Sequence, residues 1–277
     1  MKPQLNRKQR RGLCAFTLIE LLVVIIIIAA LAALIVPNIG SFGRSTDMSV
    51  SAKTQADIAN QMNQFFVLQK RFPQGLDSLL DTSGALYSSD TTNADTQTRG
   101  LPYGGADGTR LQAQLTVATL TNATNAEYMR SFTRVGVDWV YDHDTAVVNS
   151  NLSNTTFRGL IADANGTGNT APTSIPVAEV TGTYLLGKLV PGGLKAGQRI
   201  VAFGFGQKNT AIGKTSTTCP LYPGADKTYY GRYVAYYMVY ASGERATLVG
   251  VSDAYGRTPD YTEQQFNESL PDGARQG

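Results

Sequence analysis

The longest run of apolar residues in the chain lies near its N-terminus. From residue 16 to residue 36, Glu20 is the only charged side chain and Thr17 the only other polar one. A helix rises about 1.5 Å per residue, so this run is about 32 Å long, enough to cross the roughly 30 Å hydrocarbon core of a bilayer. The pattern therefore predicts a membrane-spanning helix at residues 16–36.

Behind this run, apolar residues recur every three or four positions, which is typical of an amphipathic helix. The recurring residues are Ala52, Ala56, Ala59, Met62 and Phe66, with Ile58 and Phe65 beside them. Pro37 removes one helical hydrogen bond and can kink a helix without ending it. We therefore expect one near-continuous helix over residues 17–69, whose second half, residues 37–70, packs on a globular body. Pro73 and Gly75 end it.

Residues 71–277 have the pattern of a β-rich body. We expect strands at residues 114–120, 132–141, 157–162, 184–190, 199–205, 229–240 and 247–251, a short one at 146–148, a helical turn at 76–80, exposed loops at 81–110 and 165–173, a hairpin turn at 242–243 and a short helix from residue 262. The expected fold class is α+β, with the long N-terminal helix packed on an antiparallel sheet.

The basic charge of the chain is concentrated in its first 15 residues. The chain has 24 Lys and Arg against 21 Asp and Glu, and residues 1–15 hold five of the basic residues and none of the acidic ones. The remainder is slightly acidic, so no nucleic-acid partner is expected. Positive residues flank membrane helices on the cytoplasmic side, which places the C-terminal body across the membrane.

Glu20 is an unusual residue within an apolar helix. An ionised carboxylate in hydrocarbon costs about 2.5 to 3.5 kcal/mol, so such a group usually has a partner. If the chain were cut before Phe16, the new α-amino group would lie within about one helical turn of Glu20. Small residues, Gly12 and Ala15, precede the apolar run, whereas the cleavage site of a secretory signal follows it. The apolar run would therefore be kept.

The segment FTLIE from Phe16 to Glu20, followed by an apolar run ending at Pro37, resembles the N-terminal signature of type IV pilins and of type II secretion pseudopilins. The resemblance implies that a prepilin peptidase removes a leader of residues 1–15 and N-methylates Phe16. It also implies that Glu20 guides assembly and that Pro37 kinks the helix. The family has Gly before the cut, where this chain has Ala15. Cleavage between Gly12 and Leu13 is the second candidate, but it shifts the register of Glu20 by three residues.

The resemblance also implies a location and partners. The processed subunit stays in the inner membrane as a single-pass protein with its body in the periplasm or outside the cell. A platform protein and an ATPase then assemble it, with itself and other pilin-like subunits, into a helical filament. The segment FPQGL at residues 72–76 resembles the corresponding region of pseudopilins, which favours type II secretion. The alternatives are a type IV pilin, major or minor, and a tethered binding or enzymatic ectodomain.

No catalytic site is expected, because the sequence has neither a Gly-x-Ser-x-Gly turn nor a P-loop. The only histidine, His143, lies among three aspartates. Asp142 and Asp144 share one face of a strand and become calcium ligand candidates if this segment is a turn. We favour a solvated strand end and expect no cofactor.

Other residue clusters have structural interpretations. Cys219 remains alone once the leader with Cys14 is removed, and burial is favoured over pairing between chains. The tyrosines between residues 229 and 240 are expected in the core and on a sheet face rather than in a binding platform. The spacing of Gly204, Gly206 and Gly213 does not fit a phosphate loop, and glycines at alternate strand positions indicate a bulge or a close backbone approach.

Overall fold

The computed structural model describes residues 18–87, 100–102, 110–121, 126–143, 156–162, 164–168, 170, 172–223 and 230–259, with the backbone alone for residues 34–45 and 165. The chain divides into two compact units, Met1–Arg44 with Gly277, and Ser45–Gln276. The helix expected from residue 262 and the strand expected at 146–148 lie outside the described residues.

Helix α1, Leu18–Gln69, is continuous over its 52 residues and contains Pro37. It ends at Lys70, which adopts the left-handed conformation with φ 58° and donates its N–H to the carbonyl of Phe66 at 2.8 Å. The prediction of one long helix is confirmed over residues 18–69, while Thr17 lies outside the described residues.

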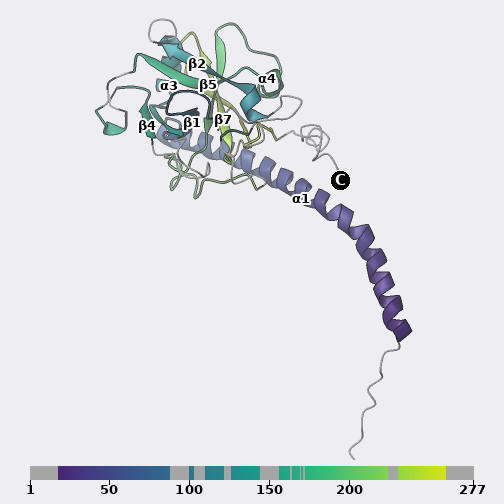
Figure 1. Ribbon diagram of the computed structural model, residues 1–277. Coiled ribbons are helices and arrows are strands. Elements are labelled where there is room, and N and C mark those ends of the chain that lie inside the picture. The colour runs from purple at the N-terminus through teal and green to yellow at the C-terminus, as the bar shows by residue number, and fades with distance from the viewer. Residues whose placement is uncertain are drawn as a thin grey trace, which may run out of the picture. The chain divides into compact units, whose positions relative to one another are not determined.

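The described residues of the second unit form an eight-stranded sheet (Figure 1). Its path runs β2-β5-β6-β1-β3-β4, while β7 pairs with β6 and β8 pairs with β7. The strands are β1 Leu76–Asp81, β2 Leu115–Thr121, β3 Trp139–His143, β4 Thr156–Gly159, β5 Ser174–Val180, β6 Gln198–Gly204, β7 Val234–Tyr240 and β8 Thr247–Ser252.

The sheet is mixed, so the expectation of an antiparallel sheet was wrong at one pair. Strands β1 and β3 run parallel, with Leu76 opposite Val140 and Asp77 opposite Tyr141. Parallel neighbours need a long crossover connection. Here the chain between them contains α2 Leu111–Gln114, β2 and α3 Ala126–Thr133.

Five segments differ from the expected elements. Residues 76–80 are a strand rather than a helical turn, and residues 184–190 lie mostly in helix α4, Thr183–Leu189. The strand expected at 132–141 is divided between α3 and β3 by a turn at Gly136, φ 72°. Strand β5 was not expected, and the first two residues of the loop expected at 165–173 belong to the 3-10 helix Ala164–Gly166.

The second half of α1 supplies one wall of the main core. Its buried row is Ser51, Gln55, Ile58, Met62 and Phe65, all at most 3 % exposed. This row shares Met62 with the expected stripe and otherwise lies one residue earlier in the sequence, so that Ile58 is buried in place of Ala59 and more apolar surface is removed from water there. The three apolar members pack in one cluster with residues of β6 and β7.

The polar stretch 81–110 also contributes to the core. Tyr87 and Leu101 are 2 % and 1 % exposed and belong to a second hydrophobic cluster. The backbone N–H of Leu101 donates to the carbonyl of Tyr87 at 2.8 Å. This hydrogen bond joins two parts of the stretch that are 14 residues apart in the sequence. The expectation that the stretch has almost nothing to bury was therefore wrong at these residues.

Candidate functional site

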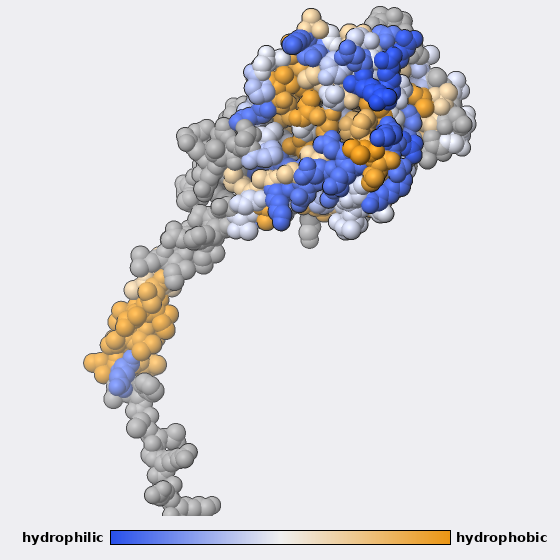
Figure 2. Space-filling view, turned by 180° about the vertical axis from the view of Figure 1, so that it is seen from behind, coloured by the Kyte–Doolittle hydropathy of each residue, from blue (hydrophilic) through white to orange (hydrophobic). Residues whose placement is uncertain are grey.

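The first 16 described residues of α1 expose apolar side chains on every side. All of residues 18–33 are exposed, and apart from Glu20 all are apolar. The exposed fraction is 82 % at Leu18 and still 58 % at Ile28. Figure 2 shows this segment as an almost uniformly hydrophobic rod. Helices that are apolar on every side are typically buried, either in lipid or among other helices.

Glu20 lies in the first turn of α1, where an acidic side chain interacts favourably with the positive end of the helix dipole. The side chain is exposed on the apolar rod. The candidate cleavage residues Gly12, Leu13, Ala15 and Phe16 lie outside the described residues, so cleavage and methylation stay predictions. The backbone at Pro37 is helical, while its side chain lies outside the described part.

In the part of the chain that the structure describes, no helix is both long and apolar enough to cross a membrane. The span expected at residues 16–36 stays a prediction.

Asp142, the aspartate that precedes His143, is buried rather than solvated. Asp142 is 5 % exposed, and its Oδ1 accepts hydrogen bonds from Nη2 of Arg158 at 2.7 Å and from Oγ of Ser78 at 2.5 Å. The His143 ring stacks on Tyr87 with centroids 4.0 Å apart. The expectation of a solvated strand end was wrong because β3 lies inside the sheet, between β1 and β4.

No group of three potential metal ligands is found among the described residues. Asp142 already binds Arg158 and Ser78, and the other calcium candidate, Asp144, lies outside the described residues. Calcium binding therefore stays an untested expectation.

A buried charged pair lies next to His143. Arg232 Nη1 is 3.4 Å from Oδ2 of Asp77, and both side chains are at most 2 % exposed. Tyr230 donates its hydroxyl to the same oxygen at 3.0 Å. Burial, together with the charge of Arg232, lowers the pKa of His143 to about 3, so this imidazole is neutral at physiological pH. Sequence patterns did not identify this pair, since its members are 155 residues apart.

Gly204 and Gly206 leave room for the buried polar groups. A Cβ on Gly204 would meet the hydroxyl of Tyr230, and a Cβ on Gly206 would meet the carboxylate of Asp77. The prediction of a close backbone approach is confirmed. The tyrosine prediction is confirmed as well for Tyr233, Tyr236 and Tyr237, which are fully buried, whereas Tyr229 lies outside the described residues.

Cys219 is a partly buried free thiol. Its Sγ donates to the carbonyl of Phe205 at 2.7 Å, and burial raises its pKa to about 12. The thiolate is the reactive form of cysteine, so this residue is a poor nucleophile at neutral pH. The prediction that Cys219 packs as a small apolar group is confirmed in part.

The comparison with protein families matches the N-terminal segment. Residues 10–36 fit the family described as "Prokaryotic N-terminal methylation motif". No curated protein and no solved structure matches the chain significantly. The matched residues include both cleavage candidates, Glu20 and the whole apolar rod. The chain thus carries, at residues 10–36, the prepilin-type signature of type IV pilins and pseudopilins.

Proposed function

We propose that the chain is a prepilin-type filament subunit, and specifically a pseudopilin of a type II secretion system. The observation that carries the proposal is the exposed apolar rod of residues 18–33, which contains one acidic residue and lies inside the matched methylation motif. In this proposal the chain is a structural protein rather than an enzyme. The neutral, buried His143 and the protonated Cys219 support this assignment.

The proposed mechanism begins with proteolysis. A prepilin peptidase removes residues 1–15 and methylates the new N-terminus at Phe16. The subunit then stays in the inner membrane through residues 16–36, with the body on the far side. An assembly ATPase and a platform protein finally move it into a helical filament, in which it contacts copies of itself and other pilin-like subunits.

Assembly exchanges one apolar environment for another. The side chains of residues 18–33 leave lipid and pack against identical helices. They contact apolar atoms both before and after assembly, so this exchange contributes little net free energy. The gain comes from Glu20, whose carboxylate meets the α-amino group of Phe16 on an adjacent subunit. Two opposite charges about 4 Å apart attract by about 4 kcal/mol in a partly polar environment, and desolvation offsets part of this.

The segment of residues 72–76 supports the secretion branch of the proposal and has a structural role here. Trp139 Nε1 donates to Oε1 of Gln74 at 3.0 Å, and Nε2 of Gln74 donates to Asp138 at 2.6 Å. Gly75, with φ 69°, leaves room for the Trp139 ring. This segment therefore joins the end of α1 to strand β3. A type IV pilin is the alternative, since the methylation motif is common to both.

The intact mass of the chain purified from native membranes tests the proposal. We expect residues 16–277 with one added methyl group. A chain that still begins at Met1 would overturn the filament assignment and leave a tethered ectodomain.

Two matched variants locate the cut. Ala15→Val places a branched side chain next to the expected bond and should block processing, whereas Gly12→Val should be processed normally. The reverse result would place the cut before Leu13.

A further inference from the structure

A groove of about 320 Å³ runs along one edge of strand β8. The described residues that line it include residues 249–251 of β8, Ala56 and Ala59 of α1, and Lys188 of α4, which is the only charged residue among them. Successive strand residues point to opposite faces of a sheet. A groove lined by three successive residues therefore follows the strand edge and not one of its faces.

This edge of β8 offers backbone groups for pairing. Among the described residues, β8 pairs with β7 and with no other strand. An open strand edge is a template for another segment of chain, and proteins commonly cover such edges. A segment lying in the groove would bind there by strand addition, with main-chain hydrogen bonds to β8.

Gln55 independently indicates that an occupant belongs here. Its side chain is 2 % exposed, and its Nε2 donates to Oγ of Ser51 at 3.1 Å. Its Oε1 is buried and has no hydrogen-bond partner in the part of the chain that the structure describes. A buried acceptor without a donor costs about 1 to 3 kcal/mol. The occupant should therefore bring an N–H or O–H donor.

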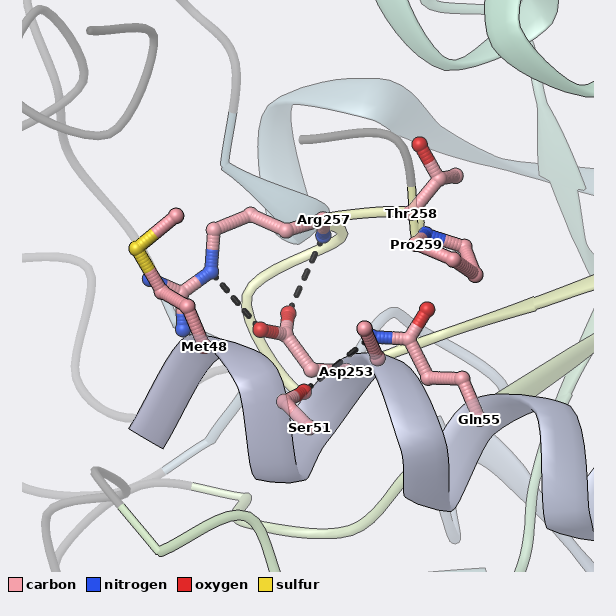
Figure 3. A pocket seen from close by; sticks show the side chains of 8 residues that line it. Met48, Ser51, Gln55, Asp253, Arg257, Thr258 and Pro259 are labelled. Carbon is pink, nitrogen blue, oxygen red and sulfur yellow. Dashed lines mark hydrogen bonds and ion pairs between the residues drawn. The ribbon is translucent and has the colours of Figure 1, made fainter. Parts of the chain in front are cut away.

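Figure 3 shows the Gln55 amide on the same side of α1 as Pro259. Gln55 and Pro259 line both the groove and a smaller adjoining pocket of about 20 Å³, to which Arg257 and Asp253 also contribute. That volume holds about one small polar group. Pro259, the last described residue of the chain, thus lies in the same groove as the Gln55 Oε1 acceptor, which has no hydrogen-bond donor among the described residues.

We propose that the occupant is the C-terminal segment of the same chain, residues 260–277, lying extended along the β8 edge in place of the helix expected from residue 262. The described chain ends at Pro259, in the wall of the groove, and continues for 18 residues. The segment contains Tyr261, Phe266 and Leu270 for an apolar groove, and its four acidic residues outnumber its one basic residue, which complements Lys188. Tethering at Pro259 raises its local concentration to about the millimolar range, so modest contacts suffice.

Truncation of the full chain after Pro259, studied in detergent by hydrogen exchange, tests the proposal. We expect the amides of residues 249–251 to exchange about tenfold faster in the truncated chain than in the intact one. A synthetic peptide of residues 260–277 should restore slow exchange to the truncated chain and leave the intact chain unchanged. Unchanged exchange on truncation, or equal binding of the peptide to both chains, overturns the proposal.

Two tryptophan variants provide a matched comparison. Ala56→Trp fills the groove from an exposed helix position, while Asp57→Trp adds the same side chain at the next exposed position, which does not line the groove. Exchange within residues 260–277 should accelerate in Ala56→Trp and stay unchanged in Asp57→Trp. Equal exchange in the two variants contradicts the proposed location.

Crosslinking identifies the source of the segment. A photoreactive phenylalanine derivative at Phe266 should crosslink to α1 or β8 within one chain. In a mixture of isotopically labelled and unlabelled chains, crosslinks that join the two kinds would show a second copy in the groove and overturn the assignment.

Discussion

Glu20 brings a charge into a helix segment whose other described side chains are all apolar. We predict that Glu20→Ala gives a processed, membrane-resident subunit that does not assemble, because the adjacent α-amino group loses its counter-charge. A pair worth about 1 to 4 kcal/mol corresponds to a loss of assembled protein between about fivefold and about a thousandfold. The measurement is the ratio of sheared filament to membrane fraction, with intact mass as proof of processing.

Asp57→Asn is the control for this variant. It removes an acidic charge from an exposed position in the second half of the same helix. It should assemble as the wild type does. Normal incorporation of Glu20→Ala would contradict the proposed pairing.

His143 couples the stability of the body to pH. Its pKa is about 3 in the folded chain against an ordinary value of 6.5, so below pH 6.5 the unfolded chain binds a proton that the folded chain does not. The free energy of unfolding should therefore fall as the pH decreases from 6.5 towards 3. From about pH 7 to about pH 4 this group contributes a loss of about 3 kcal/mol.

His143→Phe keeps a ring against Tyr87 and removes the titration. We predict that the variant loses less stability on acidification than the wild type, measured as urea midpoints in detergent at the two pH values. Burial raises the pKa values of Asp138 and Asp253, which gives the opposite slope, but both groups are present in both proteins and cancel in the difference. Parallel pH curves would contradict the assignment.

At the scale of elements, a glycine that follows a strand and a glycine inside a helix should respond oppositely to substitution by alanine. Gly206→Ala, just after β6, forces a methyl group against the Asp77 carboxylate that holds Tyr230 and Arg232, and should destabilise the fold by about 2 kcal/mol or more. Gly187→Ala, inside helix α4, meets nothing within 4 Å and should stabilise the fold by about 0.5 to 1 kcal/mol. Thermal unfolding of the two variants measures both signs. Equal shifts would show that the space at Gly206 is not limiting.

Element type was predictable from the sequence where the pattern is long. Helix α1 has an unbroken apolar run and then a three- and four-residue period, and the positions of β6 and β8 were predicted to within one residue at each end. Short apolar runs misled the prediction. Residues 184–190 fit a buried strand and a helix equally well by periodicity, and their leucines and Lys188 favour the helix that forms.

Strand β5 was missed because it contains Pro176, which normally argues against a strand. Here the proline is tolerated because β6 pairs with β5 only at Ala178 and Glu179, so the position of the missing N–H needs no partner from β6. The parallel pairing of β1 with β3 could not be predicted from the sequence either. It depends on which distant segments meet, and local periodicity carries no information about that.

At the scale of the molecule, the candidate site was far easier to predict than the body. Glu20 and the apolar rod are local features, and the methylation motif at residues 10–36 matches the same segment. The Asp77–Arg232 pair and the groove beside β8 join residues far apart in the chain. The two units therefore differ in how they expose apolar side chains. Residues 18–33 of the first unit expose them, whereas the second unit buries most of its large apolar side chains in two hydrophobic clusters.

A deletion experiment distinguishes the two candidate functions, a type II secretion pseudopilin and a type IV pilin. If the chain is a pseudopilin, cells lacking it should lose exported enzymes from the medium, by about tenfold or more, while surface fibres stay unchanged, because the filament acts within the secretion apparatus. Enzyme activity in the culture medium and electron microscopy of the cell surface are the two measurements.

Complementation by the wild type should restore export and complementation by Glu20→Ala should not, which would show that the phenotype depends on assembly through the apolar rod. Loss of surface fibres with normal export would instead identify a type IV pilin, and full rescue by Glu20→Ala would show that the body acts without polymerising.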